Sequence, residues 1–126
     1  MVTVAVCSSC KLTPDAAFDA RGRSGGEILA AALERLAGER GQQVRIIRHE
    51  CLWACSNSCA VLIQSPGKTG YLAGRFEAGL PAAEAILDWS AAQARSSDGA
   101  VAYKQWPEGI KGHFIARIPA IGEAEP

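Results

Sequence analysis

The fold is decided by residues 24–47, SGGEILAAALERLAGERGQQVRII. Ser24 and Glu27 have the spacing of a capping box, which predicts that a helix begins here. The apolar residues that follow recur at steps of three and four and predict one buried helix face: Ile28, Leu29, Ala32, Leu33 and Leu36. Glycines bracket the end of this helix, and the β-branched run Val44–Ile47 predicts a strand directly after it.

Strands are also predicted on both sides of this segment. Val2–Val6 is a short apolar run, and a strand, a helix and a second strand in this order form a crossover unit with parallel strands. Cys59–Gln64 and Thr69–Ala73 flank a Ser-Pro-Gly-Lys turn, which predicts an antiparallel hairpin. Pro81 then begins a second helix, whose buried stripe is Ala82, Ala85, Ile86 and Trp89.

The predicted fold class is therefore α/β, in the order β-α-β-β-β-α, with a mixed four-stranded sheet in a single domain of 126 residues. Its core spans about residues 2–95, and a proline-containing C-terminal extension covers about residues 100–126. The 13 basic and 13 acidic residues cancel without long runs, which disfavours nucleic acid or a membrane as the main partner. Since no signal peptide and no membrane span are predicted, we expect a cytoplasmic protein whose thiols stay reduced.

Four of the five cysteines form two tight pairs that this topology brings together. Cys7 and Cys10 follow the first strand, and Cys51 and Cys55 follow the second. Because parallel neighbouring strands end at the same edge of a sheet, we expect the two pairs to meet and offer four thiolates. Such a set suits zinc or an iron–sulfur cluster. The C-x3-C spacing of the second pair, with apolar Leu52 and Trp53 inside it, favours a shielded [2Fe-2S] cluster.

Two other interpretations of the cysteines stay open. Cys7 and Cys10 could form the dithiol of a thiol-disulfide oxidoreductase, although such enzymes place the pair at a helix start and the first helix here begins only near Ser24. A zinc site is the second alternative. Cys59 is predicted to be a buried core thiol, with a role as substitute ligand as its alternative.

Charged residues near the pairs are predicted to play a secondary part. His49, two residues before Cys51, is interpreted as a strand-end residue or as a hydrogen-bond donor to a ligand. Lys11, Arg45 and Arg48 are interpreted as a solvated face, with contact to an acidic redox partner as the alternative.

The segment HECLWACSNSCAVL, residues 49–62, followed by Ser-Pro-Gly-Lys, Tyr71 and a late helix, resembles the thioredoxin-like [2Fe-2S] ferredoxins. This fold also serves as the small cluster subunit of respiratory NADH dehydrogenase. The whole chain resembles a family of bacterial proteins described only as predicted metal-binding, with an early Cys-x-x-Cys and an Ala-Arg-Ile-Pro ending, here residues 116–119. That family is often associated with cobalamin-biosynthesis genes.

The resemblance implies a thioredoxin-like fold in which Cys7, Cys10, Cys51 and Cys55 hold the cluster. Two departures separate this chain from the ferredoxins: their first pair is spaced more widely, and many of them have proline where this chain has Cys59. The implied function is one-electron transfer to a redox partner protein rather than catalysis. The resemblance also implies a possible homodimer, for which the tail or an exposed Trp106 would serve. The alternatives are a zinc or cobalt carrier linked to cobalamin biosynthesis and the dithiol oxidoreductase.

Overall fold

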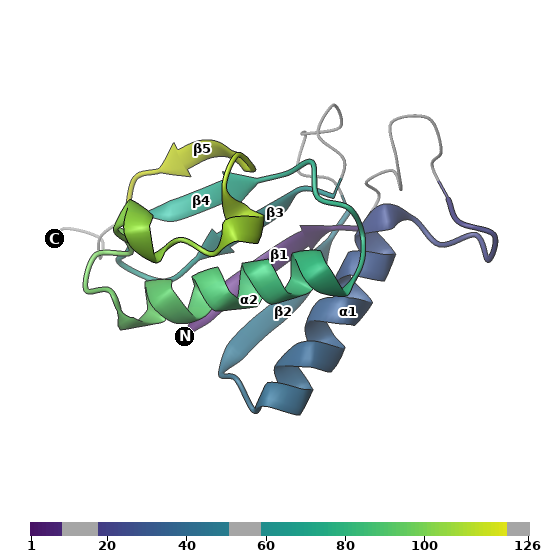
Figure 1. Ribbon diagram of the computed structural model, residues 1–126, viewed down its shortest axis with the longest axis horizontal. Helices are drawn as coiled ribbons and strands as arrows, with labels where there is room; N and C mark the ends of the chain where they lie inside the picture. The colour runs from purple at the N-terminus through teal and green to yellow at the C-terminus, as the bar shows by residue number, and fades with distance from the viewer. Residues whose placement is uncertain (9–17, 51–58, 121–126) are drawn as a thin grey trace, which may run out of the picture.

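The structure is a computed structural model that describes residues 1–8, 18–50 and 59–120. These residues form a mixed five-stranded sheet in the order β2-β1-β3-β4-β5, and two α-helices lie on one face of it (Figure 1). Neither of these helices is long and apolar enough to cross a membrane. The elements are β1 (Val2–Cys7), α1 (Gly25–Arg40), β2 (Val44–His49), β3 (Val61–Gln64), β4 (Gly70–Ala73), α2 (Leu80–Arg95), the short 3-10 helices η1 (Tyr103–Gln105) and η2 (Glu108–Ile110), and β5 (Phe114–Ile118).

The crossover unit β1-α1-β2 is present as predicted. β1 and β2 are parallel and in register from Val2↔Val44 onwards. The side-chain oxygen of Ser24 caps α1 by accepting a hydrogen bond from the backbone N–H of Glu27 at 3.1 Å. The helix ends at Gly41, whose φ of 61° is in the left-handed region that favours glycine. The antiparallel hairpin of β3 and β4 is also confirmed.

The prediction of four strands is wrong, because the C-terminal extension supplies a fifth. β5 pairs antiparallel with β4, with Leu72 opposite Ala116 and an irregularity between Leu72 and Ala73. The prolines of this region stand outside β5, where they cost the sheet no hydrogen bond. Prolines in the C-terminal extension are therefore compatible with a strand between them. The predicted third strand was also too long, since β3 begins at Val61 rather than at Cys59.

The hydrophobic core lies between the sheet and the two helices. Alternate residues of the central strands face the helices, and the predicted stripe of α2 is buried against them. Helices α1 and α2 also contact each other. The largest fully buried side chains of this layer include Val4, Val6, Leu29, Leu33, Val61, Ile63, Ile86 and Trp89.

An aromatic cluster attaches the C-terminal extension to this core. Trp89 of α2 contacts the rings of Tyr71, Trp106 and Phe114, with ring centroids 4.8–5.5 Å apart. The indole N–H of Trp106 donates to the carbonyl oxygen of Val101 at 2.8 Å. The expectation of an exposed Trp106 is therefore wrong: its ring is partly buried on the core, since edge-to-face aromatic packing stabilises it there.

Candidate functional site

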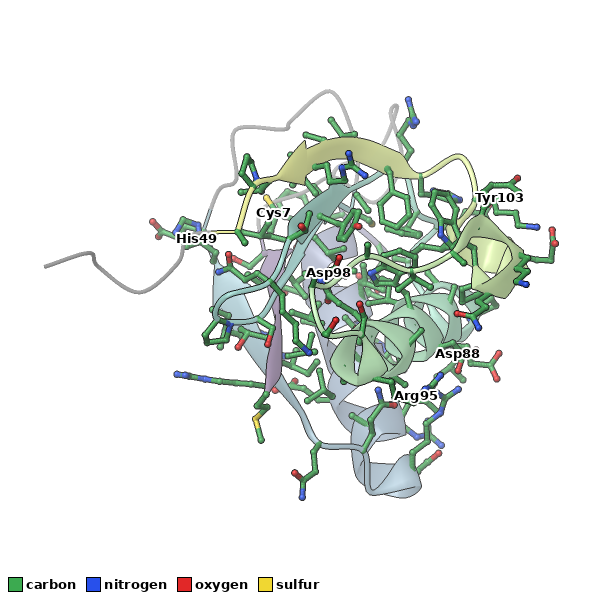
Figure 2. The ribbon with its side chains drawn as sticks, turned by 90° about the vertical axis from the view of Figure 1, so that its left-hand side faces the viewer. Cys7, His49, Asp88, Arg95, Asp98 and Tyr103 are labelled. Atoms are coloured by element: carbon green, nitrogen blue, oxygen red, sulfur yellow. The ribbon has the colours of Figure 1, made fainter. Side chains whose placement is uncertain are left out.

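The carboxyl ends of β1 and β2 lie side by side, and they carry Cys7 and His49 to the same edge of the sheet. These two residues are opposite each other in the register, and Figure 2 shows them close together. The backbone N–H of Ser8 donates to the carbonyl oxygen of His49 at 2.8 Å, and the Ser8 hydroxyl donates to the same oxygen at 3.2 Å. The two strands therefore stay joined one residue beyond Cys7.

Cys7 is buried at this edge. Only 1% of its surface is exposed, and its backbone N–H donates to the carbonyl oxygen of Ala60 at 3.0 Å. Its thiol lies 3.9 Å from the carbonyl oxygen of Glu50, a distance at which a thiol is a weak donor. Cys7 is thus held between the residues that follow β2 and those that precede β3.

Cys59 is the second cysteine at this edge. It is completely buried, as predicted, and belongs to the hydrophobic core. Its φ of 54° is in the left-handed region, which residues other than glycine adopt rarely. Burial, and to a smaller extent the charge of Cys7, raises the pKa of the Cys59 thiol to about 11. Ala60, the residue after Cys59, accepts the backbone hydrogen bond of Cys7, so the structure brings Cys59 near Cys7.

The first turn of α1 packs directly against the Cys7–Ser8 segment. The Ser24 hydroxyl donates to the carbonyl oxygen of Ser8. A Cβ atom at Gly26 would overlap the carbonyl oxygen of Cys7 and would lie 2.8 Å from its carbonyl carbon. The positive end of the helix dipole therefore faces the peptide that follows Cys7. Sequence reasoning did not assign Ser8 or Gly26 to the site, and the Gly-Gly pair after Ser24 is the signal that could have found the close approach.

Three of the four predicted ligands, Cys10, Cys51 and Cys55, lie outside the described residues, as does Lys11. Within the described ranges, no group of three or more His, Cys, Asp or Glu side chains is arranged to hold a metal ion. Of the five cysteines, these described ranges include Cys7 and Cys59. The joint site of four thiols, including the ligand role of Cys7, thus stays a prediction.

The charged residues are distributed on both faces of the sheet. Arg48 of β2 forms a two-bond ion pair with Glu34 of α1, at 2.7 and 2.9 Å, so it belongs to the helix side. Arg45 is exposed on the opposite face. His49 is exposed at the end of β2, which agrees with its interpretation as a strand-end residue.

A family model, "Protein of unknown function (DUF1636)", matches residues 4–120, which is nearly the whole chain. The chain belongs to the DUF1636 family. No curated protein and no solved structure matches it. The matched region of this DUF1636 protein includes all five cysteines and ends two residues after β5. The matched region of this chain therefore contains both the candidate site and the fifth strand.

Proposed function

We propose that this DUF1636 protein is a cytoplasmic one-electron carrier of thioredoxin-like type, in which Cys7, Cys10, Cys51 and Cys55 hold a [2Fe-2S] cluster. The observation that carries the proposal is the register pair Cys7↔His49, because it places the chain just before Cys10 beside the chain just before Cys51. Two cysteine pairs far apart in the sequence thus start from neighbouring points. The similarity of residues 49–62 to the thioredoxin-like ferredoxins supports the same ligand set.

The chemistry of Cys7 fits such a group. A thiolate is the ligand that iron–sulfur clusters take, and Cys7 is buried from water by its own fold. When bound, the cluster supplies one-electron transfer. Residues of the chain position the backbone around the proposed cluster. Ser8 joins the ends of β1 and β2, and Ser24 and Gly26 pack α1 against these strand ends. Burial and nearby backbone N–H groups then set the reduction potential.

Two experiments test the proposal on protein purified under argon. The visible spectrum should be that of a reddish-brown [2Fe-2S] protein that bleaches with dithionite, with iron and sulfide in equal amounts. A colourless preparation with stoichiometric zinc or cobalt would instead support the metal-carrier alternative linked to cobalamin biosynthesis. A colourless, metal-free protein that reduces disulfides through Cys7 and Cys10 would support the oxidoreductase.

Matched serine variants test the ligand assignment. Cys10→Ser should bleach or shift the visible spectrum, because it removes a proposed ligand. Cys59→Ser should leave the spectrum intact, because Cys59 is assigned to the core. The assignment of ligands is wrong if Cys59→Ser strips the metal and Cys10→Ser does not, an exchange that the proximity of Cys59 to Cys7 would then explain.

A further inference from the structure

The face of the sheet opposite the helices contains a groove of about 390 Å³. This volume is in the range of small-molecule sites. One wall is a row of side chains from three adjacent strands, Arg45, Thr3 and Gln64, which are opposite one another in the register. The other wall is formed by Ile118 and Pro119 of the C-terminal extension. Together these residues make a cleft that crosses the sheet.

Gly70 lies between the two walls, and the space there is open because glycine has no side chain. A Cβ atom at this position would lie 3.5 Å from the Cβ of Gln64 and 3.6 Å from the Cβ of Ile118, which are ordinary contacts. A larger side chain at position 70 would therefore occupy the groove without straining the strand. The groove thus depends on the absence of one side chain.

The polar end of the groove is suited to an anion. Within the described part of the chain, the side chains of Arg45, Thr3 and Gln64 form no hydrogen bond or ion pair with another residue, so their donors are available. Lys68 adds a second positive charge, although its ammonium group also donates to the carbonyl oxygens of Gln93 and Ala94 at 3.3 and 3.1 Å. Among the residues that the structure describes, those that line the groove include no carboxylate. A guanidinium beside a hydroxyl and an amide matches a carboxylate group.

The next row along the strands is apolar. Ile47, Ala5, Leu62 and Leu72 are opposite one another in consecutive strand pairs, and the three larger side chains are half-buried. This row lies two residues further along each strand than the polar row, which is a distance of about 7 Å. Of this row, Ile47 lines the groove, together with the apolar side chains of Pro66, Ile118 and Pro119. A ligand with an anionic head and a short aliphatic body would contact the polar row and these apolar side chains.

We propose that this groove binds a small organic anion of this kind, an aliphatic carboxylate, with Arg45 as the residue that recognises the charge. The site is separate from the candidate metal centre. Thr3 and Cys7 are four residues apart on β1, which corresponds to about 13 Å along the strand. The proposal therefore does not depend on whether the cysteines bind a cluster.

The test is a titration of the ¹⁵N-labelled full chain with hexanoate, followed by amide chemical shifts, with neutral hexanamide as the matched probe. We expect saturable shifts at Thr3, Gln64 and Gly70 and a dissociation constant in the millimolar range, as befits so small a ligand. Hexanamide should bind at least about tenfold more weakly, because it lacks the charge that Arg45 recognises. Shifts that do not saturate, shifts that map to another surface, or equal affinity for the two probes would overturn the proposal.

Substitutions of single residues test where hexanoate binds. Arg45→Glu should weaken hexanoate binding about tenfold or more, whereas Lys104→Glu, the same change of charge on the exposed helix η1, should leave it unchanged. Gly70→Val should abolish binding by filling the groove. Equal losses in Arg45→Glu and Lys104→Glu would show a general effect of net charge and would refute the site. Arg45 is exposed, so its replacement tests the proposal even if Gly70→Val fails to fold.

Discussion

Replacement of Gly26 by alanine is the sharpest test of how α1 is joined to Cys7. Gly26 is in the first turn of the helix and is fully buried. A Cβ atom there would overlap the carbonyl oxygen of Cys7 and would come within 2.9 Å of the Cα of Ser8. Both are backbone atoms, so no flexible side chain can move aside. Either the helix or the end of β1 must shift.

Two opposing effects set the magnitude. Alanine favours a helix over glycine by about 0.5–1 kcal/mol, an advantage that is smaller in the first turn. Inserting a methyl group into a well-packed region costs about 1–3 kcal/mol, and backbone contacts place this site at the upper end of that range. We therefore expect Gly26→Ala to lower the free energy of unfolding by about 2 kcal/mol.

The same helix provides a matched control. Gly38 is exposed, and a Cβ atom there would meet nothing within 4 Å. Gly38→Ala should raise the free energy of unfolding by about 0.5–1 kcal/mol, because only the helix preference remains. Urea unfolding followed by tryptophan fluorescence measures both values. If Gly26→Ala is as stable as the unaltered protein, or changes stability as Gly38→Ala does, α1 does not pack on Cys7 as described.

Three further predictions follow from the same contacts. Ser24→Ala should lower the free energy of unfolding by about 1–2 kcal/mol in urea, since it removes the helix cap and the bond to Ser8, and an unchanged midpoint would contradict this. Trp89→Ala should cost about 3–5 kcal/mol and erase the near-ultraviolet dichroism of the aromatic cluster, and retention of that signal would refute the packing. Hydrogen bonds from the backbone N–H of Ala100 and then from the Ser96 hydroxyl hold the pKa of Asp98 below its usual 3.8. Because this pKa is depressed in the folded state, the ionised Asp98 stabilises the fold above pH 3.8, and this stabilisation is lost as the pH falls through the folded pKa. Asp98→Asn should therefore make the free energy of unfolding depend less on pH in this acid range.

The sequence was sufficient to predict the first half of the fold. Helix periodicity, the Ser24 cap and the β-branched strands are local signals, and they predicted β1, α1, β2 and the hairpin with errors of a few residues at the ends. The parallel pairing of β1 and β2 followed from the length of the crossover. The edge common to Cys7 and His49 could therefore be predicted as well.

The remaining features depend on contacts between distant segments. β5 is defined by its pairing with β4 and by the packing of Phe114 on Trp89, and neither leaves a local signal. The proximity of Cys59 to Cys7 arises from the way β3 returns beside β1. The steric role of Gly26 depends on its contact with the end of β1, which the residues around it in the sequence do not indicate. For the candidate site, the structure shows the position of Cys7, and the ligand roles of all four proposed cysteines stay predictions.

The position of β1 inside the sheet has a consequence for biosynthesis. This first strand pairs with β2 on one side and with β3 on the other, so Thr3 is opposite both Arg45 and Gln64. At a translation rate of 5–20 residues per second, roughly 3–12 s separate the synthesis of Thr3 from that of Gln64. During this interval the nascent chain exposes a β-branched strand that lacks its neighbour β3, which is the kind of segment that chaperones bind. The sheet can therefore form completely only after the ribosome has synthesised its later strands.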